Sequence, residues 1–519
     1  MSEIVETQGG RVRGSEERGV RVYRGIPYAA PTAGEGRWRA PRPAAPWPGV
    51  REARRPGPPA PQADGPTLAL LGVEAVRASE DCLSLDVWTP GPGGSGRPVL
   101  VWIHGGGFVT GSGSLPVYDG AALARAGDAV DVTLGYRLGA LGFLSLPELA
   151  GIEAGAPANF GLLDQLAALE WVRANAAAFG GDPERVCLFG QSSGAMCIGA
   201  LLAAPRAQGL FARAILQSGA ASNVHPAERA ARVTAVFCEE LGVSASDGRA
   251  LRAAPLAAIL AAQQRAQERL RGEPEPPAFQ PCADGALLPE LPLAAFAAGR
   301  AARIPLLVGT NRDEWKFYAM GDPKARVLDD AGLLRRFERA LPGQDSAGRP
   351  WAARAIEAYR AARAGRASVE PAELWFAIQS DRWFRFPALR LAELHAAQGG
   401  EVRAYLFDWP SPALGGWLGA CHGLEIPFVF GGGADPRLAP FVGGGDEVKA
   451  LSECMQQAWL DFARGEAPCL PEVGSWPTWE RERRATLRLG RRCEVLLRPF
   501  DAELAFWEEI AFREEIAPR

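Results

Sequence analysis

The sequence predicts an α/β fold in which a central, mostly parallel sheet is covered by helices on both faces and carries large loop and helix insertions. Short, apolar runs that end at or near a glycine are typical of buried central strands. Apolar residues at three- and four-residue spacing indicate helices between those runs. Strands that alternate with helices form mostly parallel sheets. Since no internal repeat is visible, we expect one domain over residues 1–519.

Five short runs are the candidate strands, at residues 99–103, 130–134, 186–189, 214–216 and 304–308. The last contains Pro305, which a strand tolerates only near its start. Helical spacing predicts a helix over residues 162–179, which the turn at 180–183 closes. Three stretches rich in proline or glycine are predicted loops: 56–61, 272–277 and 431–446. None looks long enough to separate independent domains.

Composition excludes several classes of protein. The chain is 47% hydrophobic and 22% charged with a net charge of -4, which is typical of a soluble globular protein and argues against a nucleic-acid partner. The first residues lack the basic and apolar regions of a secretory signal, and no apolar run is long enough to span a membrane. The nine cysteines contain no Cys-x-x-Cys pair, so we expect small, buried, reduced thiols in a cytoplasmic protein.

The segment Gly190-Gln191-Ser192-Ser193-Gly194 matches the pattern Gly-x-Ser-x-Gly. The five letters alone are weak evidence, because an ordinary strand-helix turn rich in glycine has the same composition. Here, however, the segment follows an apolar strand and precedes a helix predicted over residues 193–204. That context is the sharp turn on which hydrolases hold a nucleophilic serine, so Ser192 is the candidate nucleophile.

A serine nucleophile needs a base, and the chain has four histidines. His104 precedes the serine in His104-Gly105-Gly106-Gly107, where an exposed glycine backbone suits an oxyanion hole, so it is expected to shape that loop. His225 follows the serine too closely for the usual order of serine, acid and histidine. His395 lies in a helical surface pattern and is expected to be solvated. His422 lies in a loop of small residues and is the best candidate.

The base in turn needs an acid, and two carboxylates follow the strand at 304–308. Asp313 and Glu314 both lie just past its carboxyl end, where sites are built in open α/β sheets. Either one could instead begin a helix, with Asp313 as the cap. Spacing alone does not choose between them.

Taken in order, these motifs resemble the type-B carboxylesterase family, which includes cholinesterases and para-nitrobenzyl esterases. The resemblance covers nearly the whole chain and implies an α/β-hydrolase fold. Further matching segments are Gly25-Ile26-Pro27-Tyr28-Ala29, Glu80-Asp81-Cys82-Leu83-Ser84-Leu85-Asp86-Val87, Tyr136-Arg137-Leu138-Gly139, Asn159-Phe160-Gly161-Leu162-Leu163-Asp164-Gln165, Phe179-Gly180-Gly181-Asp182-Pro183 and His422-Gly423-Leu424-Glu425-Ile426-Pro427-Phe428.

The resemblance also implies roles for residues. It assigns the acid to Glu314 and leaves Asp313 structural, and it takes the oxyanion donors from the backbone of Gly106, Gly107 and Ser193. It implies two buried ion pairs that hold the scaffold, Arg137 with Asp164 and Arg37 with Glu80.

Several positions depart from the family pattern. Gln191 replaces a glutamate, which removes a charge that would favour cationic substrates. Ser193 replaces an alanine, and Trp315 replaces the glycine after the acid and is expected to reshape the wall there. Asp131 lies in a strand that is usually apolar in the family, and Gly135 replaces the usual asparagine there. Cys82 matches a cysteine that is often disulfide-bonded in the family, but no cysteine precedes it here.

The expected activity is ester hydrolysis through an acyl-enzyme on Ser192, with a Ser-His-Glu triad and with neither a metal nor a cofactor. The expected partner is a small-molecule ester, and no particular oligomeric state is predicted. Because the reference pKa of histidine is about 6.5, activity should fall as the pH drops through that range. The alternatives are a lipase, a carbamate or amide hydrolase or a transesterase on the same triad, and a binding member of the family without catalysis.

Overall fold

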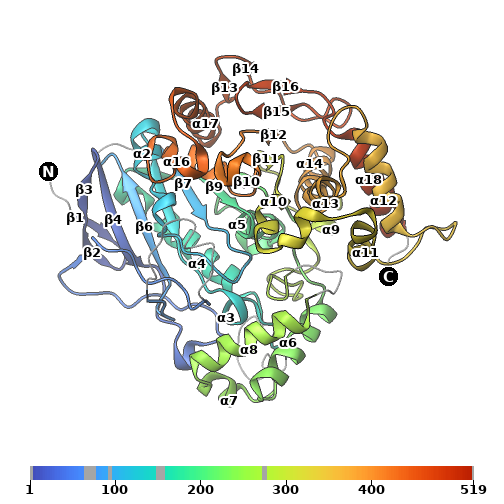
Figure 1. The fold of residues 1–519 in the computed structure, drawn as a ribbon. Helices are drawn as coiled ribbons and strands as arrows, with labels where there is room; N and C mark the ends of the chain where they lie inside the picture. Colours follow the sequence, from blue (N-terminus) through green and yellow to red (C-terminus); the bar gives the residue numbers. More distant parts are fainter. Residues whose placement is uncertain (1–3, 64–76, 92–95, 148–157, 272–276, 517–519) are drawn as a thin grey trace.

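The computed structural model describes residues 4–63, 77–91, 96–147, 158–271 and 277–516, without the side chains of 434 and 512–516. A twisted central sheet runs through the molecule with helices packed on both faces (Figure 1). This arrangement confirms the predicted fold class. Most of the predicted loop at 272–277 lies outside the described residues.

The central sheet has eleven strands in the order β16-β15-β12-β11-β10-β9-β7-β8-β6-β4-β3. The seven from β15 to β8 are parallel, and antiparallel strands close both edges. Their bounds are β3 Ser15–Glu17, β4 Val20–Pro27, β6 Ser84–Thr89, β7 Arg97–Ile103, β8 Val130–Leu134, β9 Gly181–Gln191, β10 Arg213–Gln217, β11 Leu306–Asn311, β12 Val402–Phe407, β15 Thr486–Leu489 and β16 Glu494–Leu496. Two small sheets join β1 Ile4–Thr7, β2 Gly10–Arg13 and β5 Val50–Glu52, and β13 Cys469–Leu470 and β14 Gly474–Ser475.

Alternate residues of each buried strand serve opposite faces of the sheet. In β7, Val99 and Val101 join one core and Leu100 and Trp102 the other. The first core is covered by α3 Gly139–Phe143, α4 Phe160–Asn175, α5 Ser193–Ala203 and α14 Phe386–Ala397, and the second by α2 Ala121–Gly127, α15 Ile426–Val429 and α17 Asp446–Arg464. Burial on both faces explains why these strands are continuous apolar runs.

The predicted insertions are two groups of helices outside the central layers (Figure 1). One contains α6 Ala227–Leu241, α7 Gly248–Ala253 and α8 Leu256–Arg269, and the other α11 Asp330–Ala340, α12 Trp351–Arg363, α13 Pro371–Ser380 and α18 Asp501–Ile516. The second group buries a core of its own around Leu333, Tyr359 and Leu374. Further helices are α9 Pro292–Ala297, α10 Trp315–Tyr318, a π-helical turn at Asp381–Arg385 and α16 Ala439–Val442.

Short 3-10 turns occupy several connections: η1 Gly34–Gly36, η2 Pro116–Tyr118, η4 Ala176–Phe179, η5 Pro205–Ala207, η6 Ala319–Gly321, η7 Pro323–Val327, η9 Ala413–Gly416 and η10 Gly432–Ala434. The predicted helix over 162–179 is therefore α4 followed by η4, and β11 begins just after Pro305. The loop predicted at 431–446 is wrong in part, because it contains η10 and α16. Pro440 lies in the first turn of α16, a position that suits proline and that composition alone does not reveal.

The two implied ion pairs are present. Arg137 and Asp164 lie 2.6 Å apart and are both buried, and Arg37 contacts Glu80 at 2.6 Å. None of the nine cysteines, all of which the structure describes, forms a disulfide, and six of them are buried. Within the described ranges, no helix is both long and apolar enough to cross a membrane.

Asp131 is the single ionisable residue of strand β8, and it is fully buried. It lies opposite Trp88 in β6. Neither carboxylate oxygen of Asp131, nor the indole nitrogen of Trp88, has a hydrogen-bond partner among the described residues. Burial, and to a smaller extent the charge of Asp119, holds the pKa of Asp131 well above its ordinary range. The residue therefore costs stability wherever the unfolded chain would ionise it.

We predict that Asp131→Asn stabilises the protein, and more at pH 8 than at pH 5. The unfolded carboxyl ionises above about pH 4 while burial opposes ionisation of the folded one, so the wild type loses stability as the pH rises and the amide does not. Thermal midpoints at both pH values measure the difference. Asp330→Asn, at an exposed ion pair with Arg360, is the matched control and should change little. A midpoint for Asp131→Asn below that of the wild type at both pH values would contradict the prediction.

Candidate active site

Ser192 occupies a strained turn between β9 and α5. Its backbone has φ 56° and ψ −129°, a region that side chains rarely adopt. The neighbouring chain leaves room only for glycine at positions 190 and 194, two residues before and after the serine. A Cβ on Gly194 would lie 2.0 Å from the carbonyl oxygen of Ile103, and one on Gly190 would lie 2.7 Å from the same atom. The turn also donates the Ser192 N–H to the carbonyl of Gln217 at 2.8 Å. The structure thus contains the sharp strand-turn-helix that the sequence predicts.

Of the two candidate acids, the structure brings Glu314 to His422. Oε2 of Glu314 lies 2.6 Å from Nδ1 of His422, and Oε1 accepts the backbone N–H of Asn311 at 2.8 Å. Glu314 has no exposed surface. Both of its oxygens are therefore occupied, in a place from which water is excluded, and the contact fixes the orientation of the imidazole.

Asp313 points away from the imidazole and supports the loop that carries it. Its carboxylate accepts the backbone N–H of Ala420 at 3.0 Å and contacts the guanidinium of Arg312 at 2.9 Å. It does not cap α10 with its side chain, the alternative considered for it. Asp313 therefore helps to place the His422 loop without touching the histidine ring.

The second nitrogen of His422 contacts Gln191, the neighbour of the serine. Nε2 of Gln191 lies 3.0 Å from Nε2 of His422. Because Nδ1 is occupied by the Glu314 carboxylate, Nε2 of a neutral imidazole is an acceptor and the amide N–H donates to it. Ser192 is the next residue, so the serine turn meets the ring through the amide of Gln191.

A second buried carboxylate, Glu425, lies behind this pair. It accepts the side-chain N–H of Asn311 at 2.6 Å and that of Gln217 at 3.3 Å. Burial, followed by repulsion from Glu314, raises the pKa of Glu425 to about 7. Sequence reasoning assigned it no role. The sequence feature that could have indicated a role for Glu425 is its position three residues after the histidine, directly before the single turn of α15.

The glycine loop after β7 lies against the serine turn. Gly106 and Gly107 have φ 119° and 61°, and a Cβ on Gly106 would lie 2.0 Å from the carbonyl oxygen of Thr110. A Cβ on Gly105 would lie 3.1 Å from Cβ of Ser192. In contrast, nothing lies within 4 Å of a Cβ placed on Gly107, so that residue borders open space. Ser193, the third predicted donor, is the first residue of α5.

The other three histidines are structural and buried. His104 stacks on Tyr136 with ring centroids 4.4 Å apart, and burial lowers its pKa to about 4. Burial also lowers the pKa of His225 to about 4. The prediction that His395 is solvated is wrong. It is 2% exposed, and its Nε2 lies 2.8 Å from the carbonyl oxygen of Ile304, because that face of α14 packs on the segment entering β11.

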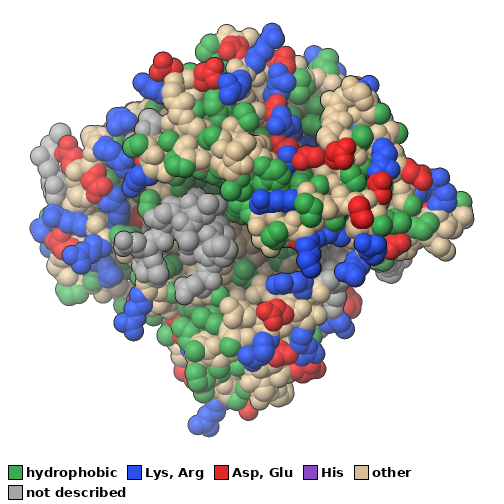
Figure 2. All heavy atoms as spheres, in the orientation of Figure 1, with side chains coloured by type: hydrophobic (Ala, Val, Ile, Leu, Met, Phe, Trp, Pro, Cys, Tyr) green, Lys and Arg blue, Asp and Glu red, His purple; other side chains and the backbone are tan. Residues whose placement is uncertain are grey.

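Three aromatic rings lie close to the imidazole of His422. Phe384, Tyr318 and Phe317 have centroids 4.7, 5.3 and 6.1 Å from the imidazole. Trp315, the unusual residue after the acid, extends this wall by contacting Tyr318 at 4.9 Å and Trp383 at 6.0 Å. The face shown in Figure 2 is hollowed near its middle, beside α10, and hydrophobic side chains border the hollow.

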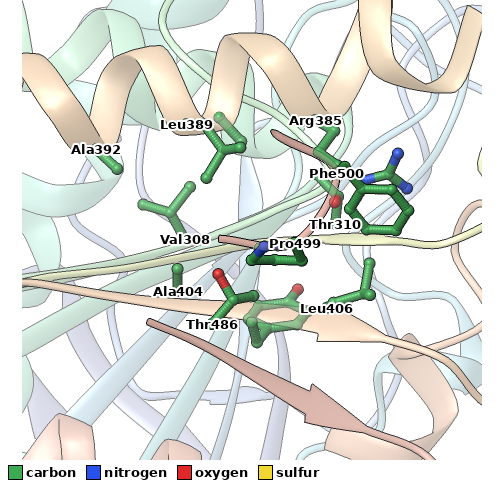
Figure 3. A pocket seen from close by; sticks show the side chains of 13 residues that line it. Val308, Thr310, Arg385, Leu389, Ala392, Ala404, Leu406, Thr486, Pro499 and Phe500 are labelled. Carbon is green, nitrogen blue, oxygen red and sulfur yellow. The ribbon is translucent and has the colours of Figure 1, made fainter. Parts of the chain in front are cut away.

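The π-helical turn at Asp381–Arg385 positions both the wall and the acid. Arg385 pairs with Asp381 and donates to the backbone carbonyls of Asn311 and Arg312 at 3.3 and 2.9 Å, just before Glu314. Its guanidinium lies 4.1 Å from the ring of Phe500, and both border a small cavity of about 20 Å³ between α14 and the sheet (Figure 3). That cavity is large enough for about one water molecule. Neither the serine nor the histidine lines it.

Comparison with known proteins gives consistent matches over nearly the whole chain. A sequence profile of the carboxylesterase family matches residues 1–507. Para-nitrobenzyl esterase of Bacillus subtilis (strain 168) is 39% identical over 493 residues, or 95% of this chain and 96% of that protein. Phenmedipham hydrolase of Pseudarthrobacter oxydans is 38% identical over 497 residues, or 94% and 95%. A solved carboxylesterase of Geobacillus stearothermophilus has a TM-score of 0.85 and 39% identity, covering 97% of this chain and 100% of that one.

Proposed function

The chain belongs to the carboxylesterase family, and we propose that Ser192 is the nucleophile with which it hydrolyses carboxylic esters. Its fold is that of the α/β-hydrolases. In this proposal His422 is the general base and Glu314 the acid that orients it. The observation that carries the proposal is the 2.6 Å contact between Glu314 and His422, beside a serine on a strained turn.

Acylation begins when an ester carbonyl lies beside Ser192. His422 takes the serine proton on Nε2 as Oγ attacks the carbonyl carbon. The negative charge on the former carbonyl oxygen is stabilised by the backbone N–H groups of Gly106, Gly107 and Ser193. The imidazolium then gives its proton to the leaving alcohol, the carbon–oxygen bond breaks, and the acyl group remains on Oγ.

Deacylation repeats these steps with water. His422 takes a proton from water as its oxygen attacks the acyl carbon, and the same N–H groups stabilise the oxyanion. The proton returns to Ser192 Oγ as the carboxylic acid leaves. Glu314 accepts from Nδ1 throughout and stabilises the imidazolium that forms in each half-reaction, without taking the proton.

The charges around the ring favour uncharged esters. Glu314 and Glu425 are both fully buried behind His422, whereas the residue on the serine side is the neutral Gln191. The wall that faces the ring consists of Phe317, Tyr318 and Phe384. The wall offers apolar surface to a neutral ester, and the neutral Gln191 adds no charge that would hold a cationic group.

Lipase, carbamate hydrolase, amide hydrolase and transesterase activities would use the same residues. Turnover of short-chain esters, long-chain esters and carbamates, compared on one preparation, separates these activities. We propose a small neutral ester as substrate and no nucleic-acid partner, in keeping with the net charge of -4. Cytoplasmic residence is likewise a proposal, supported by nine cysteines that form no disulfide and tested by cell fractionation.

Replacing the nucleophile should abolish the activity. We expect Ser192→Ala to lower kcat for p-nitrophenyl acetate by at least about 10³-fold, because the hydroxyl that forms the acyl-enzyme is removed. A fluorophosphonate probe should label the wild type at Ser192, as read by peptide mass spectrometry, and leave the variant unlabelled. Full activity in Ser192→Ala would refute the mechanism.

The two adjacent carboxylates should behave differently. We expect Glu314→Gln to lower kcat by about 10²- to 10⁴-fold, since the imidazolium loses its partner. Asp313→Asn is the matched control, and it should mainly lower the thermal midpoint because Asp313 supports Ala420 and not the ring. Both quantities are measured for each variant. The reverse pattern would assign the acid to Asp313.

The amide beside the serine should set the acidic limit of activity. In Gln191→Glu a carboxylate would lie near Nε2 and stabilise the imidazolium. The acidic midpoint of the kcat/KM profile should therefore move up by about one pH unit, so that the variant loses activity sooner on acidification. Gln191→Met, which has similar size and no charge, should not move it upward. Coinciding midpoints in the wild type and Gln191→Glu would contradict the contact.

A further inference from the structure

Gln191, the residue before the serine, occupies the nitrogen with which the base must act. Its Nε2 lies 3.0 Å from Nε2 of His422, and both side chains are buried. The other ring nitrogen, Nδ1, lies 2.6 Å from the Glu314 carboxylate, so the proton of the neutral imidazole is on Nδ1. The amide N–H therefore donates to Nε2, the one lone pair through which His422 can take a proton.

The amide and the serine hydroxyl compete for that lone pair. A neutral imidazole has one acceptor nitrogen, and its lone pair directs a single well-aligned hydrogen bond. A general base must be within hydrogen-bond reach of the proton that it takes. Transfer of the Ser192 proton to His422 therefore requires the serine O–H to replace the amide at Nε2. The structure shows the arrangement that precedes this exchange.

The contact depends on the departure from the family pattern at this position. An ionised glutamate, the usual residue there, only accepts hydrogen bonds and could not donate to the neutral ring. The amide of Gln191 has two N–H donors and can. Occupation of Nε2 is thus a property of the amide at position 191.

The surroundings of the amide admit it and leave it room to move. A Cβ on Gly105 would lie 2.9 Å from Oε1 of Gln191, so the glycine leaves the space that the amide fills. A Cβ on Gly423 would lie 3.8 Å from Nε2 of Gln191 and 3.6 Å from Cδ1 of Ile426, and it would meet no other described atom within 4 Å beyond its chain neighbours. Rotation of the Gln191 side chain can therefore carry the amide off Nε2 of His422.

We propose that the Gln191 amide reversibly blocks the base, and that Ser192 becomes reactive when the amide leaves Nε2 of His422. This proposal rests on the proposed function, with Ser192 as nucleophile. The amide-bound and serine-bound arrangements are in equilibrium, and acylation is slowed in proportion to the fraction of enzyme that is competent. Gln191 keeps both amide protons, while the serine proton passes to His422 and then to the leaving alcohol.

The block changes the rate without changing the basicity of the ring. In one arrangement the amide donates to Nε2, and in the other the serine hydroxyl does so. The neutral imidazole therefore has one donor at Nε2 in both, and its pKa stays nearly the same. Release of the block should raise the rate and leave the acidic limit of activity where it is.

The test is Gln191→Met, which has similar size and no N–H to donate. We expect the second-order rate constant for labelling of Ser192 by the fluorophosphonate to rise roughly three- to tenfold, the effect of one neutral hydrogen bond. The value of kcat/KM for p-nitrophenyl acetate should rise by a similar factor, with an unchanged acidic midpoint. A supporting role for the amide predicts the opposite sign, because loss of a support lowers activity.

Gln280→Met is the matched control. Nε2 of Gln280 lies 3.0 Å from Nδ1 of His225, so this variant removes a buried amide–imidazole contact of the same length. His225 is one of the structural histidines, and labelling of Ser192 should stay at the wild-type rate. Thermal midpoints of both variants show how much stability each contact contributes.

Crystals of the wild type provide a measurement that does not depend on the folding of a variant. In the free enzyme, Nε2 of Gln191 should lie within hydrogen-bond distance of Nε2 of His422. In the enzyme phosphonylated at Ser192, the amide should have moved off the ring. An amide that keeps its contact with Nε2 in the phosphonylated enzyme would overturn the proposal.

The kinetic results can overturn it as well. Equal or slower labelling of Gln191→Met would show that the amide does not hold back the serine. Faster labelling of Gln280→Met as well would assign the gain to general loosening of the protein. Failure of the proposed function itself is distinguishable, because Ser192→Ala would then remain active and the wild type would not be labelled at Ser192.

Discussion

The contact between the buried carboxylate of Glu314 and the imidazole of His422 is the interaction around which the site is arranged. A carboxylate with no exposed surface needs a partner for each oxygen, and Nδ1 of His422 and the N–H of Asn311 are those partners. Other groups hold the two chain segments together. Arg385 binds the carbonyls before the acid, and Asp313 binds the loop before the histidine. Removal of any of these supports would leave a buried charge less well paired.

The parallel sheet explains how distant segments reach that contact. The strands β7, β9 and β11 are parallel, so their carboxyl ends lie at one edge of the sheet. The glycine loop, the serine turn and the acid each follow one of these strands. Their backbones approach so closely that Cβ atoms on Gly105 and Gly194 would collide with neighbouring chain. The strain at Ser192 is therefore sustained by the packing of two neighbouring strands and a helix.

The distribution of charge around His422 is uneven. Glu314 and Glu425 lie on its buried side, while Gln191 and the rings of Tyr318 and Phe384 lie on the others. The carboxylate of Glu314 therefore meets the imidazole at Nδ1, whereas Nε2 meets the neutral amide of Gln191. Trp315 and Tyr318 both belong to α10, and Trp315 contacts the Tyr318 ring that lies beside the histidine.

Local features of the sequence determined the central strands, the serine turn at Ser192, the glycine loop and the choice of His422, because periodicity, turn chemistry and chain order are properties of short segments. The residues alone left Asp313 and Glu314 open, and only the family resemblance favoured Glu314. The tertiary structure decided which carboxylate meets the ring, since that contact joins residues 108 positions apart. It also decided the burial of His395, the contact of Gln191 with His422 and the place of Tyr318. These depend on how helices and loops pack against the sheet, which no local pattern specifies.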